Sequence, residues 1–129
     1  TMPLSQHPSL PYLATLFGTI FLGFGLNYML RPRATYLSSF GFAYPSTAAD
    51  QNIMDNVMVL YGAKDVFMAA AIYSATWFGS RKSAGLILAA ASLSAGVDGW
   101  VVGRVTGGGQ WNHWGYGSVM GVLGVVMAG

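Results

Sequence analysis

Aspartates are the residues of this chain that could do chemistry, and three of the four lie in apolar stretches. The sequence contains no glutamate and no cysteine, so its carboxylates are Asp50, Asp55, Asp65 and Asp98. An apolar environment favours the neutral form of a carboxyl group, which can then act as a general acid. The pattern therefore favours acid/base chemistry, whereas thiolate catalysis, disulfides and thiolate metal sites are excluded.

The composition indicates that these aspartates lie in a membrane. Hydrophobic residues make up 53% of the 129-residue chain and charged residues only 8%, whereas soluble domains carry roughly 25% charged residues. The mean hydropathy of +0.49 agrees. The net charge of +2 comes from scattered bases, so no basic stripe supports a nucleic-acid partner. We expect a single all-α integral membrane domain.

Apolar segments of membrane-spanning length divide the chain into four expected spans. They cover residues of about 10–30, 53–78, 83–105 and 113–129. About 20 apolar residues are needed to cross a bilayer as a helix, and the runs lack the period-two alternation of barrel strands. Small residues spaced four apart, such as Gly99 and Gly103, would let helices approach closely, although glycine is also simply common in membrane helices. The sequence predicts an integral membrane four-helix bundle.

The longest connection, residues 32–52, is expected to be a lid-like loop. It carries five large apolar or aromatic side chains, Tyr36, Leu37, Phe40, Phe42 and Tyr44. Long loops without secondary structure are uncommon in compact domains and are usually functional or disordered. The aromatic residues predict that this loop lies on the membrane surface or over a pocket.

Alternating spans place the polar side chains in one half of the membrane. At about 1.5 Å per helical residue, Lys64 and Asp65 fall near the bilayer centre and Asp98 falls toward the side of the 32–52 loop. The other polar candidates expected in this half are Asp55, Asn56, Arg104, His113 and Tyr116. Charged groups within the hydrocarbon are costly and usually face a functional cavity. We therefore expect one polar cavity that opens toward this loop and is closed on the other side.

Helical phase predicts which of these residues can pair. Asp55 and Asp65 fall on one stripe of their helix. Lys64 points about 100° away from Asp65, so a direct ion pair between these neighbours is not expected. Asp55 and Arg104 come out at similar depth on neighbouring helices, and we expect that they could form a structural clamp there.

The buried ionisable residues also have explanations that involve no function. Asp98 could form a hydrogen bond that holds two helices together. Asp65 and Lys64 could each have a structural partner on another helix. His113 lies between two tryptophans and could belong to an interfacial aromatic belt.

Short motifs in the chain resemble those of a known family. They are NIMD at 52–55, YGAKD at 61–65, DGW at 98–100 and GQWNHWG at 109–115. Together they resemble a fungal family of small four-helix integral membrane proteins of unknown function, which is grouped with DoxX-like proteins. Its members are often linked to secondary-metabolite pathways. The resemblance implies a lipophilic polyketide or terpenoid substrate and a location in the endoplasmic reticulum, but it implies no catalytic residues.

The leading hypothesis is a membrane-embedded, cofactor-independent acid/base enzyme that acts on a lipophilic natural-product intermediate. Asp98 and Asp65 would form the acid/base pair, and Asp55 is a third candidate catalytic residue. The candidate substrate-binding residues are Lys64, Arg104, His113, Tyr61, Tyr116 and Asn56. The reaction would be epoxide opening, cyclisation or isomerisation. No metal is expected, because the two histidines are far apart and no ligand pair has helical spacing.

Two other functions are compatible with the sequence. The chain could be a non-catalytic membrane subunit or scaffold whose polar residues bind a partner protein or a lipid, and a homo-oligomer is compatible with either reading. It could also be an ion or proton pathway, since intramembrane aspartate and lysine mark such relays. The apolar character of the second membrane half argues against a pathway, because a pathway needs polar groups on both sides.

Overall fold

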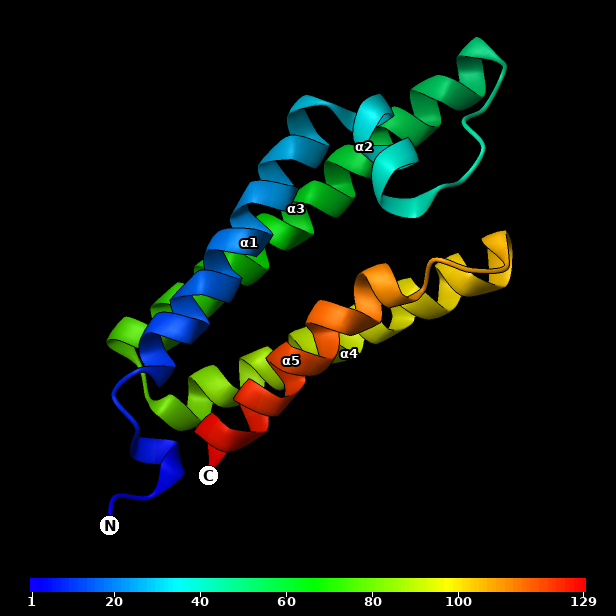
Figure 1. Cartoon of the computed structure of the whole chain (residues 1–129). Coiled ribbons are helices and arrows are strands. Elements are labelled where there is room, and N and C mark those ends of the chain that lie inside the picture. Colours follow the sequence, from blue (N-terminus) through cyan, green and yellow to red (C-terminus); the bar gives the residue numbers. More distant parts are fainter.

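The computed structural model describes all 129 residues and is entirely helical, with no strand. The elements are η1 (Leu4–Gln6), α1 (Leu10–Leu30), α2 (Pro32–Phe40), α3 (Ala48–Phe78), α4 (Arg81–Thr106) and α5 (Trp111–Ala128) (Figure 1). The all-α prediction is confirmed. The predicted count of four helices is not matched, because α2 is a fifth.

The long helices form two antiparallel pairs that meet at one end and separate at the other. α1 packs along α3, and α4 packs along α5. A short connection at residues 79–80 joins the pairs near both chain termini, and we call this the closed end (Figure 1). At the opposite, open end the pairs diverge, and α2 lies there (Figure 1).

The hydrophobic core fills the closed end. Its 13 buried members are Leu10, Ala14, Phe17, Phe21, Ala69, Ile72, Ala75, Ala84, Leu88, Ala91, Met120, Leu123 and Met127. Glycines bring the helices of each pair into close contact. A Cβ added to Gly25 of α1 would lie 2.7 Å from the carbonyl oxygen of Gly62 of α3, and one added to Gly124 of α5 would lie equally close, 2.7 Å, to that of Gly85 of α4. Small residues therefore serve packing here, as expected for helices in a membrane.

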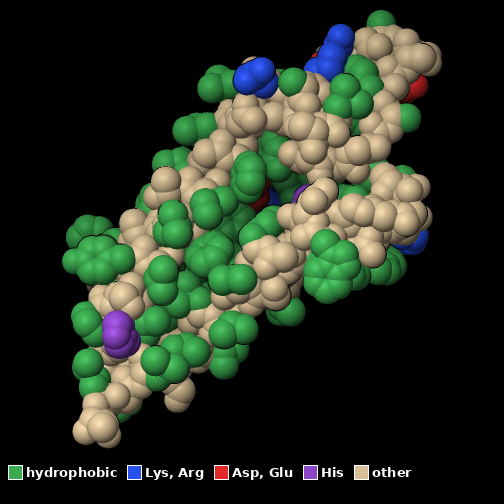
Figure 2. Space-filling view, viewed as in Figure 1, with side chains coloured by type: hydrophobic (Ala, Val, Ile, Leu, Met, Phe, Trp, Pro, Cys, Tyr) green, Lys and Arg blue, Asp and Glu red, His purple; other side chains and the backbone are tan.

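Three helices, α1, α3 and α4, are long and apolar enough to cross a membrane. The fourth expected span corresponds to α5, which has 18 residues. α5 is not among the three, since its first turns carry Asn112, His113 and several glycines. Large apolar side chains are exposed on the outer faces, for example Phe67, at 71% exposure, and Leu93, at 74%, and Figure 2 shows such side chains spread over the surface. This exterior is consistent with a membrane protein.

The prediction of a loop over residues 32–52 is wrong in part, because α2 occupies its first half. Pro32 is the first residue of α2, where its missing N–H costs nothing. Gly41, with a φ of 66°, ends α2 in the left-handed conformation. α3 then begins at Ala48, earlier than expected, and the Thr47 hydroxyl caps it by accepting a hydrogen bond from the N–H of Asp50 at 3.2 Å.

Candidate functional site

The open end contains a cavity of about 360 Å³, which we call the Asp98 cavity. Figure 2 shows that the surface is hollowed between the helix pairs at this end, where acidic, basic and histidine atoms are visible below the surface. The residues that line the Asp98 cavity are Tyr36, Phe40, Phe42, Met54, Val57, Met58, Tyr61, Asp98 and Val101. Asp98 is the only charged residue among them. The cavity therefore combines one carboxyl group with an aromatic and aliphatic wall.

Asp98 is paired with Tyr61 across the two helix pairs. The Tyr61 hydroxyl of α3 donates a hydrogen bond to the carboxylate of Asp98 on α4. Both side chains are half-buried, and both line the cavity. A molecule in this cavity would therefore meet a carboxyl group and a phenol side by side in an apolar setting.

Asp65 and Lys64 lie next to the Tyr61–Asp98 pair. Asp65 is only 4% exposed, and its Oδ1 lies 3.8 Å from Nζ of Lys64. The expectation that these neighbours do not pair is wrong, because the flexible lysine stem bends back along the helix. The same Nζ lies 3.9 Å from the centre of the Tyr61 ring and donates a hydrogen bond to Oγ of Ser94 at 3.3 Å.

The two deep aspartates differ in what they can touch. Asp65 and Asp98 belong to one cluster, because Lys64 contacts both Asp65 and the Tyr61 ring, and the Tyr61 hydroxyl is bonded to Asp98. The sequence predicted one polar cavity around these residues, but the open end has separate cavities. However, Asp98 lines the cavity and Asp65 does not. Asp98 is therefore the carboxyl group that a ligand could contact. Asp65 and Lys64 are not part of the cavity lining and could act on a ligand only through their charges.

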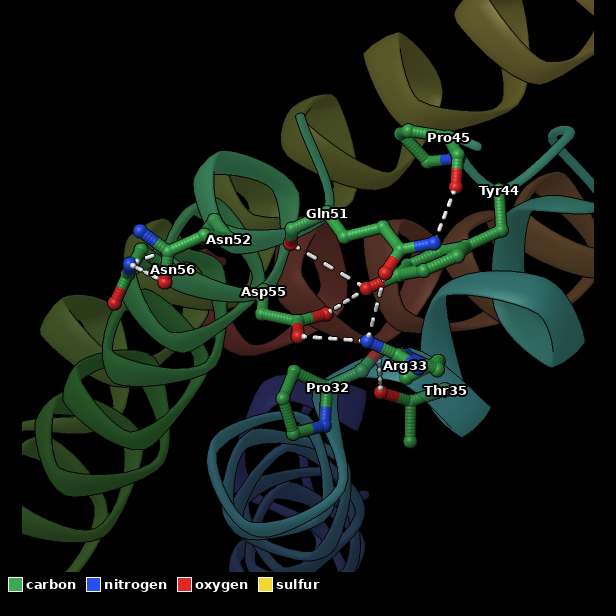
Figure 3. Close-up of polar contacts among 9 residues, drawn as sticks. All are labelled: Pro32, Arg33, Thr35, Tyr44, Pro45, Gln51, Asn52, Asp55 and Asn56. Carbon is green, nitrogen blue, oxygen red and sulfur yellow. Dashed lines mark hydrogen bonds and ion pairs between the residues drawn. The ribbon is translucent and has the colours of Figure 1, made fainter. Parts of the chain in front are cut away.

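Asp55 belongs to a separate polar network at the start of α3 (Figure 3). Its carboxylate accepts a hydrogen bond from the Tyr44 hydroxyl and lies 3.6 Å from Nη2 of Arg33. The Arg33 guanidinium also lies 4.7 Å from the centre of the Tyr44 ring and donates to Oε1 of Gln51 at 3.4 Å. Partial burial and the hydrogen bond to Asp55 raise the pKa of the Tyr44 hydroxyl above its usual value. This network holds the segment between α2 and α3 against α3.

Two other candidate binding residues lie away from the Asp98 cavity. Arg104 is exposed and lies over the ring of Trp100, 4.5 Å from its centre, so the predicted pairing of Arg104 with Asp55 is wrong. α4 has diverged from α3 at this depth, and the guanidinium finds an aromatic partner on its own helix. Asn56 is exposed and its Nδ2 donates to the carbonyl oxygen of Asn52 at 2.9 Å. No three histidine or aspartate side chains come together in a way that could hold a metal ion.

His113 and Tyr116 lie together in a second cavity of about 180 Å³, which we call the His113 cavity. Its lining residues are Phe24, Tyr28, Ser38, Ser39, Asn112, His113 and Tyr116. His113 is 5% exposed, and its Nε2 lies 3.1 Å from the carbonyl oxygen of Ser39 in α2. This contact ties α5 to α2 across the open end.

Phe40 is the central residue that the sequence reasoning did not single out. Its ring lies 5.3 Å from that of Tyr61, 5.8 Å from that of His113 and 6.4 Å from that of Tyr28. The aromatic pattern of residues 32–52 gave the signal. The sequence left open whether this segment lies on the membrane surface or over a pocket, and in the structure Phe40 lies in the wall of the Asp98 cavity. Its central position depends on α2, which the sequence reasoning missed.

Comparisons with known proteins give a family but no activity. No curated protein and no solved structure matches the chain. One family model, described as "Domain of unknown function (DUF4267)", matches residues 18–127. The matched region contains every residue that lines the Asp98 and His113 cavities. Because the match covers most of the sequence, the chain belongs to this family of unknown function.

Proposed function

We propose that the chain is a membrane-embedded acid/base enzyme that acts on a lipophilic small molecule bound in the Asp98 cavity. One observation carries the proposal: Asp98, hydrogen-bonded to Tyr61, is the only charged group in a cavity with otherwise aromatic and aliphatic walls. Ligand sites typically combine an apolar lining with a few convergent polar groups. A carboxyl group in such a lining is suited to proton transfer.

The size and location of the cavity favour a substrate from the bilayer. Its volume of about 360 Å³ lies at the lower end of the range of about 300–1,000 Å³ found for small-molecule sites. The outer faces of the surrounding helices expose large apolar side chains. A lipophilic molecule dissolved in the membrane could therefore reach the open end without passing through water.

The proposed chemistry needs only the side chains in and next to the Asp98 cavity. The Asp98 carboxylate would take a proton from an attacking water or from a carbon atom next to a carbonyl group. The resulting carboxylic acid would give this proton back to a substrate oxygen, such as that of an epoxide, or to another carbon atom, so that the enzyme returns to its starting state. Tyr61 would orient the Asp98 carboxyl group. Asp65 and Lys64 would act as positioning residues, because they do not line the cavity.

The resemblance noted in the sequence supports a narrower form of the proposal. If the chain belongs with fungal, DoxX-like proteins of secondary metabolism, its substrate is a natural-product intermediate and its location is the endoplasmic reticulum. Epoxide opening, cyclisation and double-bond isomerisation are the reactions that suit one carboxyl group and a phenol. Each moves a proton and needs no electron transfer.

The proposal is tested by proton exchange in a reconstituted bilayer. The purified chain in lipid nanodiscs is given 2-tetralone in D₂O, and α-hydrogen exchange is followed by mass spectrometry. We expect exchange faster than with empty nanodiscs, and a loss of about 100-fold or more of the catalysed rate in Asp98→Asn. Val97→Asn, on the exposed face of the same helix, controls for the introduced amide.

A folded wild-type chain that exchanges no faster than lipid alone would contradict the proposal. So would an Asp98→Asn variant with an unchanged rate. Co-purification of the inactive chain with a second protein would favour the scaffold function instead. A proton current across liposomes that Asp98→Asn abolishes would favour the pathway.

A further inference from the structure

We infer that the site takes an amphipathic substrate whose hydroxyl group is held by His113, in a compartment separated from Asp98 by the ring of Phe40. This inference rests on the proposed function and adds the class of substrate. It follows from the arrangement of the cavities around Phe40, from their different linings and from the hydrogen bonding of His113.

Phe40 separates the two cavities. Its ring is stacked on the His113 ring at an interplanar angle of 15° and meets the Tyr61 ring edge-on at 80°. His113 lines one cavity, and Tyr61 lines the other. A third cavity, of about 240 Å³, is lined by Phe40 together with Ser38, Ser39 and Asn112 of the His113 cavity. An elongated molecule could therefore pass around Phe40 and occupy both sides.

The two linings differ in polarity. Eight of the nine residues around the Asp98 cavity are hydrophobic, but only three of the seven around the His113 cavity are. The polar members of the His113 cavity include two serines, Asn112 and His113. Neither lining contains lysine or arginine. An uncharged polar group is therefore favoured in the His113 cavity over a carboxylate or a phosphate.

The contact with Ser39 determines what His113 can offer a ligand. A carbonyl oxygen only accepts hydrogen bonds, so Nε2, 3.1 Å away, must carry the proton in this contact. In the neutral ring Nδ1 is then an acceptor. Nδ1 is buried and has no hydrogen-bond partner. It is therefore an unsatisfied acceptor on a ring that lines the cavity.

A buried acceptor without a partner is unfavourable, and a hydrogen-bond donor from a ligand would relieve this. The donor must be small and neutral to suit the lining, which describes an alcohol or a phenol. The apolar body of the same molecule would lie past Phe40 in the Asp98 cavity. His113 would in this way orient the substrate so that a chosen carbon or oxygen atom faces Asp98.

Nitrogen NMR of the imidazoles tests this inference directly. The chain has only two histidines, His7 and His113, so histidine labelled with ¹⁵N gives few signals, and His7→Gln assigns them. The probes are dodecanol and its methyl ether, each added to the labelled chain in nanodiscs. We expect the His113 Nδ1 resonance to be that of an unprotonated nitrogen. Dodecanol should move it to lower frequency, as a donated hydrogen bond does, whereas the ether should not.

The inference is overturned if Nδ1 carries the proton, if neither probe moves its resonance, or if both move it equally. The same titration on Asp98→Asn separates this result from the proposed function, because the hydroxyl contact does not involve Asp98. Loss of tetralone exchange in Asp98→Asn without any dodecanol effect would leave the enzyme proposal standing and remove this one. A dodecanol effect without any exchange activity would remove the enzyme proposal and leave His113 as a residue that binds the hydroxyl group of a ligand.

Discussion

The closed and open ends of the molecule are made by the same two helix pairs but serve different purposes. At the closed end aliphatic and small side chains meet in a continuous core that contains no charged residue. At the open end the pairs separate, and aromatic rings together with Asp65, Lys64 and Asp98 occupy the space. The packed core at one end therefore holds the bundle together, while the other end is hollow.

The divergence of the helices explains why an extra element is needed only at the open end. Gly85 and Gly124 allow α4 and α5 to touch, but no comparable contact brings α1 and α3 against α4 and α5 near Asp98. α2 covers this gap with Tyr36 and Phe40, and the segment after α2 adds Phe42; all three line the cavity. α2 thereby covers the polar groups near Asp98, although the two helix pairs do not pack tightly around them.

The largest expected effect separates the two deep aspartates of the open end, Asp65 and Asp98. Asp98→Asn should reduce the catalysed exchange of 2-tetralone by about 100- to 10,000-fold, the range of a general acid/base group. Asp65→Asn should reduce it less, because Asp65 touches the cluster but not the cavity. Both rates are measured on chains that elute as single species and keep their helical circular dichroism. An equal loss in both variants would mean that Asp65 contacts the substrate too.

At the closed end the expected effect falls on stability instead. Leu88 is fully buried in the core, and Leu88→Ala should lower the free energy of unfolding by about 2–5 kcal/mol. Leu93→Ala on the exposed face of the same helix, 74% exposed, is the matched control and should change it little. Unfolding is followed by steric trapping in bicelles. The distinction between the two ends fails if Leu88→Ala, besides lowering the free energy of unfolding, changes the rate of 2-tetralone exchange of the folded chain to a comparable extent.

The sequence was sufficient to predict the class of fold and the side of the bundle that holds the polar groups. Continuous apolar runs predicted membrane-length helices, and alternation of span direction placed Asp65, Asp98 and His113 in one half. Both inferences depend only on helix length and direction. The general position of the candidate site therefore followed from elementary geometry.

Individual pairings could not be predicted, because they depend on how far the helix pairs diverge and on how long side chains bend. Asp55 pairs with Arg33, on α2, and this partner was missed because α2 was missed. Lys64 reaches Asp65 although their Cα–Cβ directions differ by about 100°. Phe40 and its position between two cavities also required the structure. Each of these contacts depends on the tertiary arrangement of the helices more than on the local sequence pattern.

The close contact within each helix pair gives a smaller effect. A Cβ at Gly25 would lie 2.7 Å from the Gly62 carbonyl oxygen, whereas one at Gly23 would meet nothing within 4 Å. Gly25→Ala should therefore destabilise the chain by about 1–3 kcal/mol through overpacking. Gly23→Ala should be neutral or slightly stabilising, since alanine favours the helix. The same unfolding assay compares them, and equal effects would show that α1 and α3 do not approach here as described.

The smallest expected effect concerns the network that holds the covering segment at the open end. Tyr44→Phe removes the hydroxyl that donates to Asp55 and should slightly lower the local opening free energy of α2, because the network loses one hydrogen bond. Hydrogen exchange of the α2 amides measures this, with Tyr12→Phe, an exposed tyrosine, as the control. Because the folded-state pKa of Tyr44 is raised, this contribution should be complete below pH of about 10 and be lost as the pH rises through the raised value. If α2 exchanges equally fast in Tyr44→Phe and wild type, the cover is held by its aromatic contacts with the cavity alone, and the Asp55 network plays no part in keeping the open end shielded.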